Sequence, residues 1–314
     1  ITCQRFTGRG YRHIVMQLIV YLKRLPMDEG IDSLEIVVDR LERYDRVYRE
    51  HLRICCEYMT EVYEAEENYR RAAYILGVLM RNVNLRKIYS VRNQFLNFIK
   101  IARLFLQCDD VMLAEEMIKE AERLLPNCTN PVFQMIYKLV ETRMLACDQK
   151  FMIAAQQYHA IATQSITLTF DEIEPLRDSI FCAILAPVGP DKYKLLEDLY
   201  NNERARNIPG FHIIEKMHLG QIIFPRELDA LEDVLQMHQL QRAPDNLDWM
   251  LHDRAVTEHN ILAMSKLFDN IKFVDLAEHL GITAGQAFVT AREMVEEGRL
   301  AALINQSNMF LHFN

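Results

Sequence analysis

The sequence predicts a mainly α protein: a right-handed, tetratricopeptide-like solenoid of helical repeats, followed by a winged-helix module with a small β-wing. Residues 31–240 keep a helical spacing of apolar residues, and the 314-residue chain has only 10 glycines and 9 prolines to interrupt it. Residues 253–314 instead follow the order helix, helix, helix, hairpin, which is that of a winged helix. We therefore predict a repeat array over residues 1–240 and a winged-helix part over residues 241–314, divided near the polar stretch around Pro244.

Three predicted helix pairs between residues 46 and 162 superpose on one another. In each pair a short polar turn precedes the second helix, and an alanine lies three residues after the first apolar residue of that helix. The equivalent positions are Tyr69, Val111 and Phe151, followed by Ala72, Ala114 and Ala154. The alanines are separated by 42 and then 40 residues, a period typical of helical repeats in which a small residue allows close packing. An unrelated all-helical bundle is the alternative.

A helix from Asp253 to Phe268 is predicted to bridge the repeats and the module. Asp253 is a favourable N-cap residue, and the apolar residues that follow form two stripes, so we expect this helix to be packed from two sides. The residues assigned to this structural bridge are Val256, His259, Asn260, Ala263 and Leu267. His259 and Asn260 are interpreted as buried polar groups with structural hydrogen bonds rather than as ligands.

The end of the chain predicts a helix from Thr283 to Glu297 and then a hairpin. Thr283 and Gln286 have the spacing of a capping box, and Asn305–Asn308 form a turn between apolar runs at 300–304 and 309–313. An exposed strand edge there would offer unpaired backbone groups to a partner. The predicted partner interface is Leu300, Ala302, Leu303, Ile304, Met309, Phe310, Leu311 and His312. We expect Leu303→Pro to block assembly and to leave the repeats folded.

The charge of the chain disfavours nucleic acid and membrane as partners. The chain carries 36 bases against 44 acids, for a net charge of −8, and residues 253–314 contain five bases against eight acids. The outward side of the helix from Thr283 is predicted to present Thr290, Glu293, Glu296 and Glu297, with Arg292 as its one base. Because DNA binding depends on neutralising phosphates, an acidic recognition helix argues against a winged-helix DNA-binding regulator, which is the alternative function.

No pattern in the sequence indicates an enzyme, a metal site or a cofactor. None of the ten histidines has another histidine two residues away, so the sequence has no His-x-His pair of zinc ligands, and no phosphate-binding glycine loop occurs. Cys55 and Cys56 lie between apolar residues and are interpreted as core. The seven cysteines form no Cys-x-x-Cys pair, which favours reduced thiols in the cytoplasm or nucleus. No stretch approaches the length of a membrane span.

The chain resembles a known family over about residues 46–313, and several segments within this range carry the resemblance. They are Lys100–Leu104, Ile184–Ala186, Ile214–Met217, Arg254–Leu262, Ser265–Phe268 and Asn270–Phe273. Together they are similar to the PCI-domain subunits of the COP9 signalosome. The related subunit of the proteasome lid is the alternative, since it shares the Glu-His-Asn of the bridging helix but lacks the Ser-Lys-Leu run that starts at Ser265.

The resemblance implies a non-catalytic scaffold or sensor subunit of a complex that deneddylates cullins in cullin-RING ubiquitin ligases. It implies assembly with other PCI subunits of the signalosome through the winged helix, and it implies the metalloprotease subunits of that complex as partners to which substrate engagement is relayed. It also implies that the repeats face the cullin-RING ligase, and that the protein is present in the cytoplasm and nucleus.

Overall fold

The computed structural model describes residues 9–163, 173–232, 235 and 249–313. The chain divides into two compact units, Ile1–Met144 and Leu145–Asn314. The second unit contains the last repeats together with the winged-helix module. The polar stretch chosen as the domain boundary falls mostly in residues 236–248, outside the described residues, so the division at residue 240 stays a prediction.

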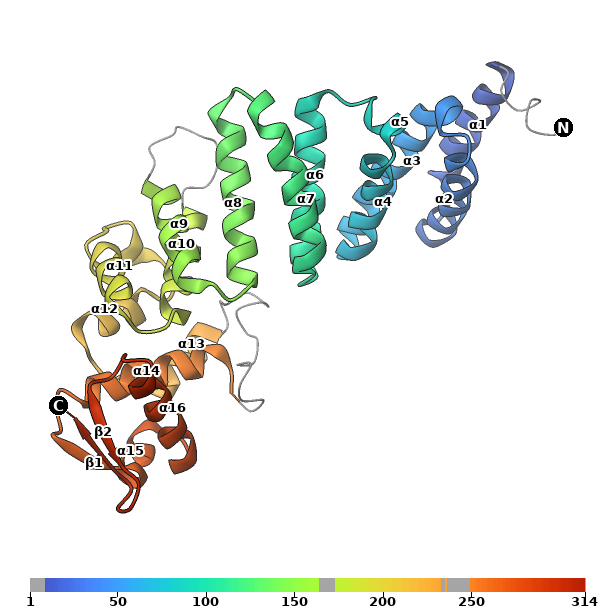
Figure 1. Cartoon of the computed structure of the whole chain (residues 1–314). Helices are drawn as coiled ribbons and strands as arrows, with labels where there is room; N and C mark the ends of the chain where they lie inside the picture. The colour runs from blue at the N-terminus through green and yellow to red at the C-terminus, as the bar shows by residue number, and fades with distance from the viewer. Residues whose placement is uncertain (1–8, 164–172, 233–234, 236–248, 314) are drawn as a thin grey trace. The chain divides into compact units, whose positions relative to one another are not determined.

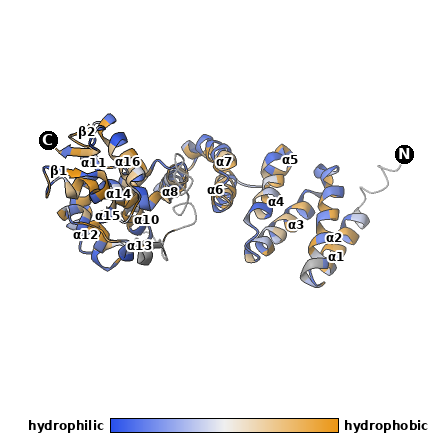
Figure 2. Cartoon of the chain, turned by 90° about the horizontal axis from the view of Figure 1, so that it is seen from below, coloured by the Kyte–Doolittle hydropathy of each residue, from blue (hydrophilic) through white to orange (hydrophobic). Residues whose placement is uncertain are grey.

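The first unit is built from helices that lie side by side in chain order (Figure 1). They are α1 (Arg9–Leu22), α2 (Met27–Glu42), α3 (Asp45–Ala65), α4 (Tyr69–Arg81), α5 (Val83–Arg86), α6 (Val91–Gln107), α7 (Val111–Leu124) and the 3-10 turn η2 (Leu125–Asn127), and α8 (Pro131–Cys147) carries the boundary between the units. Each long helix has both hydrophobic and hydrophilic residues (Figure 2). In α3 the buried residues Leu52, Cys55, Cys56, Met59 and Tyr63 recur at helical spacing, so one side of the helix forms the core.

The three predicted repeat pairs share one turn geometry. Ala72, Ala114 and Ala154 have no exposed surface, as close helix packing requires. Five residues before each alanine, a residue other than glycine adopts a left-handed conformation: Glu67 (φ 58°), Asp109 (φ 55°) and Gln149 (φ 59°). The next amide closes the end of the first helix in every case, in the bonds Asn68 N to Tyr63 O (2.8 Å), Asp110 N to Phe105 O (3.0 Å) and Lys150 N to Leu145 O (2.9 Å). The repeats therefore match in backbone as well as in sequence.

The second unit continues with helices and ends in a small sheet. Its elements are α9 (Phe151–Thr163), α10 (Ile173–Leu185), α11 (Pro190–Tyr200), η3 (Ala205–Asn207), α12 (Phe211–Leu219), α13 (Pro225–Glu232), α14 (Leu251–Met264), β1 (Asn270–Lys272), α15 (Phe273–Leu280), α16 (Ala284–Glu296), β2 (Ala302–Asn305) and β3 (Phe310–Phe313). A mainly helical fold with a small C-terminal sheet, as predicted, is confirmed.

Among the described residues, the sheet of the module has three strands rather than the two that were predicted. Its strand order is β1-β3-β2, and both neighbours pair antiparallel to β3. The prediction missed β1 because three residues are too few to show an alternating pattern. The order places β3 at the centre, so among the described residues β1 and β2 are the two edges.

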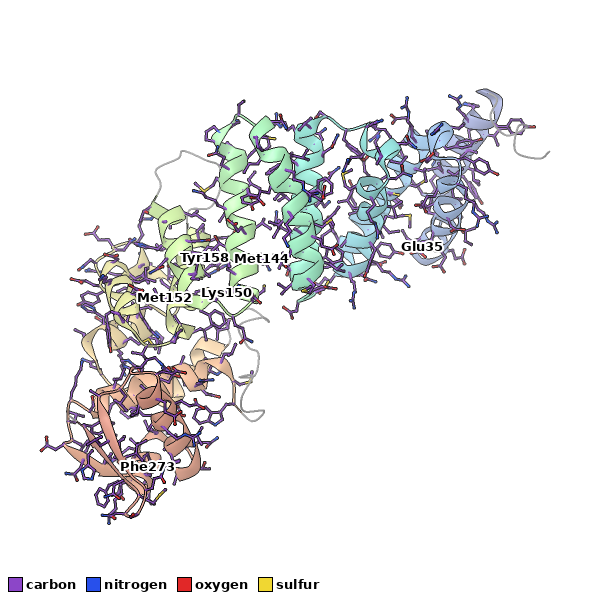
Figure 3. All side chains as sticks on the ribbon, in the orientation of Figure 1. Glu35, Met144, Lys150, Met152, Tyr158 and Phe273 are labelled. Atoms are coloured by element: carbon purple, nitrogen blue, oxygen red, sulfur yellow. The ribbon has the colours of Figure 1, made fainter. Side chains whose placement is uncertain are left out.

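The core of the module lies between this sheet and the helices α15 and α16. Phe273, labelled in Figure 3, is fully buried, and its ring meets Phe288 edge to face at 5.2 Å between centroids. Leu311 of β3 and Met294 of α16 are also fully buried in this cluster. The sheet therefore uses one face to close the core.

Among the described residues, no helix is long and apolar enough to cross a membrane.

Candidate protein-binding interface of the winged-helix module

The bridging helix α14 begins and ends earlier than the sequence predicted. It starts at Leu251, and Asp253 lies in its first turn, where the carboxylate accepts a hydrogen bond from the amide of Met250 at 3.3 Å. The helix ends at Met264 because the chain must turn before β1 starts at Asn270. The predicted span of 253–268 is therefore wrong at both ends.

This difference in helix length decides which of the predicted bridge residues are buried. Val256, His259, Asn260 and Ala263 are each at most 5% exposed. Leu267 is 67% exposed because it lies in the turn after α14, where the helical stripe no longer applies. The structure thus brings four of the five residues together and leaves Leu267 on the surface.

His259 and Asn260 bind α14 to the loop between α12 and α13. The Oδ1 atom of Asn260 accepts from the amide of Ile223 at 2.9 Å, and its Nδ2 donates to the carbonyl of the same residue at 2.8 Å. The Nε2 atom of His259 lies 2.8 Å from the carbonyl oxygen of Gln221. Burial lowers the pKa of His259 to about 4, so the ring is neutral at pH 7. Both side chains therefore form hydrogen bonds with backbone groups of the loop between α12 and α13.

A buried charge network surrounds Glu258 of α14. This carboxylate is 3% exposed and pairs with Arg254, at 3.3 Å, and with Arg299. Arg254 also reaches Glu293 of α16 at 3.2 Å. From the sequence, these residues are expected to be surface charges. Glu258 and Arg299 are far apart in the chain, and no motif predicts that they pair.

Lys192 of α11 is a second buried charge that sequence reasoning missed. Its Nζ atom donates to the carbonyls of Ile184 and Ala186 at 3.0 and 2.7 Å, at the end of α10. Burial lowers the pKa of this amine to about 7, although the nearby carboxylate of Glu258 opposes the shift. These contacts hold the end of α10 in place.

The predicted recognition helix, α16, is confirmed as a helix with a capping box. The hydroxyl of Thr283 accepts from the amide of Gln286, and the Gln286 side chain accepts from the amide of Thr283. Thr290, which was predicted to face outward, is only 5% exposed, so that assignment is wrong. Arg292 lies 3.5 Å from Glu296. Arg292, the basic residue of α16, therefore pairs with an acidic residue of the same helix.

The predicted interface residues of the wing divide into buried, half-buried and exposed groups. Leu300, Ala302 and Leu311 are at most 5% exposed and belong to the core. Ile304, Phe310 and His312 are half-buried. Leu303 and Met309 are 65% and 41% exposed. A partner can therefore touch the side chains of the second and third groups, but not those of the first.

Backbone pairing shows which groups lie on the outer edge of β2. Phe313 donates to Asp269 at 2.9 Å and Phe273 donates to Met309 at 3.0 Å, so the odd-numbered residues of β3 point their backbone groups toward β1. Because these directions alternate along a strand, Phe310 and His312 point theirs toward β2. Leu303 is opposite His312, so its backbone N–H and C=O point toward β3. The backbone N–H and C=O of Ile304 lie on the outer edge of β2.

This result changes the expected effect of Leu303→Pro. Proline at this position removes a hydrogen-bond donor within the sheet rather than one on the outer edge. The variant that addresses the edge itself is Ile304→Pro. The amide of Ala302, the other candidate on β2, already donates to the carbonyl of Leu300 at 3.1 Å.

The part of the chain that the structure describes contains no group of three or more histidine, cysteine, aspartate or glutamate residues placed to hold a metal ion. Cys55 and Cys56 are buried, and burial raises the pKa of the Cys55 thiol to about 12. Their thiols are poor nucleophiles in this setting.

Helical repeats that lead into a winged helix through a buried helix define a PCI-domain protein, and the PCI domain family model matches residues 234–314. The chain is 31% identical over 309 residues to COP9 signalosome complex subunit 4 of Emericella nidulans, which covers 96% of this chain and 75% of that protein. It is 29% identical over 309 residues to the protein of the same name from Arabidopsis thaliana, covering 96% of this chain and 77% of the relative. The chain belongs to the family of COP9 signalosome complex subunit 4.

The Drosophila melanogaster relative of the same name is 34% identical over 256 residues, covering 82% of this chain. The match spans only 62% of the length of that relative.

Proposed function

We propose that this chain is a non-catalytic scaffold and sensor subunit of the COP9 signalosome, the complex that deneddylates cullins in cullin-RING ubiquitin ligases. Its similarity to subunit 4 of that complex supports the assignment. The chemistry then belongs to the metalloprotease subunits of the complex. The repeats of this chain face the ligase, and the complex acts in the cytoplasm and nucleus.

The outer edge of β2 is the structural feature that supports a role in assembly. Within the described part of the chain this strand has a neighbour on one side only, and Ile304 has its backbone donor and acceptor on the other side. An unpaired strand edge is a template for a neighbouring chain. Another PCI subunit of the signalosome is the partner proposed for this edge.

The test compares three variants of the tagged protein, each purified from its own cells and analysed by native mass spectrometry. Ile304→Pro removes the outward donor, and Ile304→Val is the matched control that keeps it. We expect the valine variant to recover the full set of signalosome subunits and the proline variant to lose at least one PCI neighbour. Leu303→Pro serves as the comparison that breaks the sheet from within.

Two outcomes would overturn the proposal. If Ile304→Pro retains every subunit while circular dichroism shows it folded, the edge does not carry assembly. If the unmodified protein is recovered with proteasome lid subunits, or with DNA, instead of the cullin-directed metalloprotease, the signalosome role is wrong.

A further inference from the structure

The sheet of the module has a second face that the core does not use. Strand register places six side chains on it, because residues opposite one another share a face and residues two apart along a strand share it too. We call these residues the outer face: Asn270, Lys272, Leu303, Asn305, Phe310 and His312. On the opposite face, Ile271, Ala302 and Leu311 are buried in the core together with α15 and α16. In Figure 1 these two helices lie on one side of the strands.

The outer face is apolar at its centre, where Leu303 is exposed and Phe310 and His312 are half-buried. The rings of Phe310 and His312 stack along β3 at 5.9 Å between centroids. Leu303 lies opposite His312 and is 65% exposed. Neither Phe310 nor Leu303 belongs to the hydrophobic cluster that includes Phe313 and Ile304 of the same two strands. Strands β2 and β3 therefore present an aromatic and aliphatic surface that the described part of the module covers only in part.

The charge of the outer face is opposite to that of the rest of the module. Lys272 places its ammonium group 5.6 Å from the centroid of the Phe310 ring, and none of the six residues is a carboxylate. Residues 253–314 as a whole contain five bases and eight acids. A surface with a cation beside an aromatic ring, within an acidic module, is complementary to an apolar segment that carries a carboxylate.

The width of the sheet indicates which secondary structure that partner segment adopts. Neighbouring strands lie about 4.8 Å apart, so three strands span about 10 Å between the outer two. An α-helix with its side chains is about 10–12 Å across. The outer face therefore has room for one helix, whose apolar residues at helical spacing would lie over Phe310 and Leu303.

We propose that the outer face is a docking site for one amphipathic helix of a partner protein, with a carboxylate of that helix beside Lys272. The site is separate from the edge of β2, because it uses side chains rather than outward backbone groups. It does not depend on the edge pairing proposed above.

The first experiment locates the contact. The full-length protein, with the photo-crosslinking residue benzoylphenylalanine in place of Leu303, is irradiated in its own cells, and the crosslinked peptide is identified by mass spectrometry. We expect a peptide from another protein that is helical in that protein and has an acidic residue within one turn of the crosslink. Crosslinking to a second copy of this chain, to an extended segment or to nothing overturns the proposal.

The second experiment tests the chemistry with the partner so identified. Leu303→Asp and Lys272→Glu are each expected to raise its Kd at least tenfold. Leu267→Asp and Lys266→Glu are matched controls, since Leu267 is 67% exposed and both lie off the sheet; they are expected to change Kd less than twofold. Replacing the partner's carboxylate by lysine should restore binding to Lys272→Glu alone.

The two sets of variants separate this site from edge pairing. Ile304→Pro changes the edge and leaves the six side chains of the outer face, whereas Leu303→Asp changes the face and keeps every backbone donor. If Leu303→Asp weakens binding but Lys272→Glu does not, the charge argument fails and the proposal with it. Equal losses in the Leu267→Asp control would show a general effect of added charge and would also overturn it.

Discussion

Replacing Asn260 by leucine should destabilise the second unit more than any comparable surface change. Asn260 is 5% exposed, and its amide makes both hydrogen bonds to the backbone of Ile223, at 2.9 and 2.8 Å. Leucine has a similar volume but no polar atoms, so the N–H and C=O of Ile223 would stay buried without these partners. Each such group costs about 1–3 kcal/mol, so we expect a loss of roughly 2–6 kcal/mol.

This loss can be measured at two levels. Guanidinium unfolding followed by circular dichroism gives the change in the free energy of unfolding. Amide hydrogen exchange of peptides that cover residues 219–224 reports the loop itself, which should exchange faster in the variant. Asn93→Leu, at an exposed position of α6, is the control for the change in side-chain type and should shift stability by less than about 0.5 kcal/mol. A loss as small as this in Asn260→Leu, with unchanged exchange of the loop, would refute the reasoning.

Three further predictions concern other positions. His259 has a pKa of about 4 in the fold against 6.5 ordinarily, so the unfolded chain binds more protons between these values; stability should fall as pH drops from 6.5 to 4, and His259→Gln should lose that slope in denaturation series. Lys192 has a pKa of about 7 against 10.5, so the cost of burying its charged form disappears as pH rises through this window; stability should rise from pH 7 to 10 in the wild type but less in Lys192→Met. Glu67→Gly relieves a left-handed residue at φ 58° and should stabilise the first unit by about 0.5–1 kcal/mol in thermal unfolding, whereas Glu66→Gly, at φ −86°, should not.

Much of the fold could be predicted because its signals repeat along the chain. The alanines Ala72, Ala114 and Ala154 are spaced by one repeat, and the helices around them begin and end within a few residues of the prediction. The left-handed turn could not be predicted as a repeated feature, since of Glu67, Asp109 and Gln149 only the aspartate is a residue type enriched in this conformation. The surrounding helices impose it instead.

The candidate site was harder to predict because long-range pairing determines it. Leu267 fits the stripe of a helix in sequence, but the start of β1 ends α14 before this residue is reached. The position of β1 beside β3 decides in turn which backbone groups of β2 face outward. Glu258 and Arg299 come together only in the folded chain, so no local sequence pattern predicts their ion pair.

The strand order also has a consequence for how the module is made. Of the three strands described, β3 is translated last, and both β1 and β2 hydrogen-bond only to it within the sheet. Until Phe310–Phe313 emerge, neither earlier strand has a partner in the sheet, and the place of Leu311 in the core is empty. No two of the described strands can therefore pair before β3 is made, and the proposed docking surfaces of the winged helix become available only after the repeats have been translated.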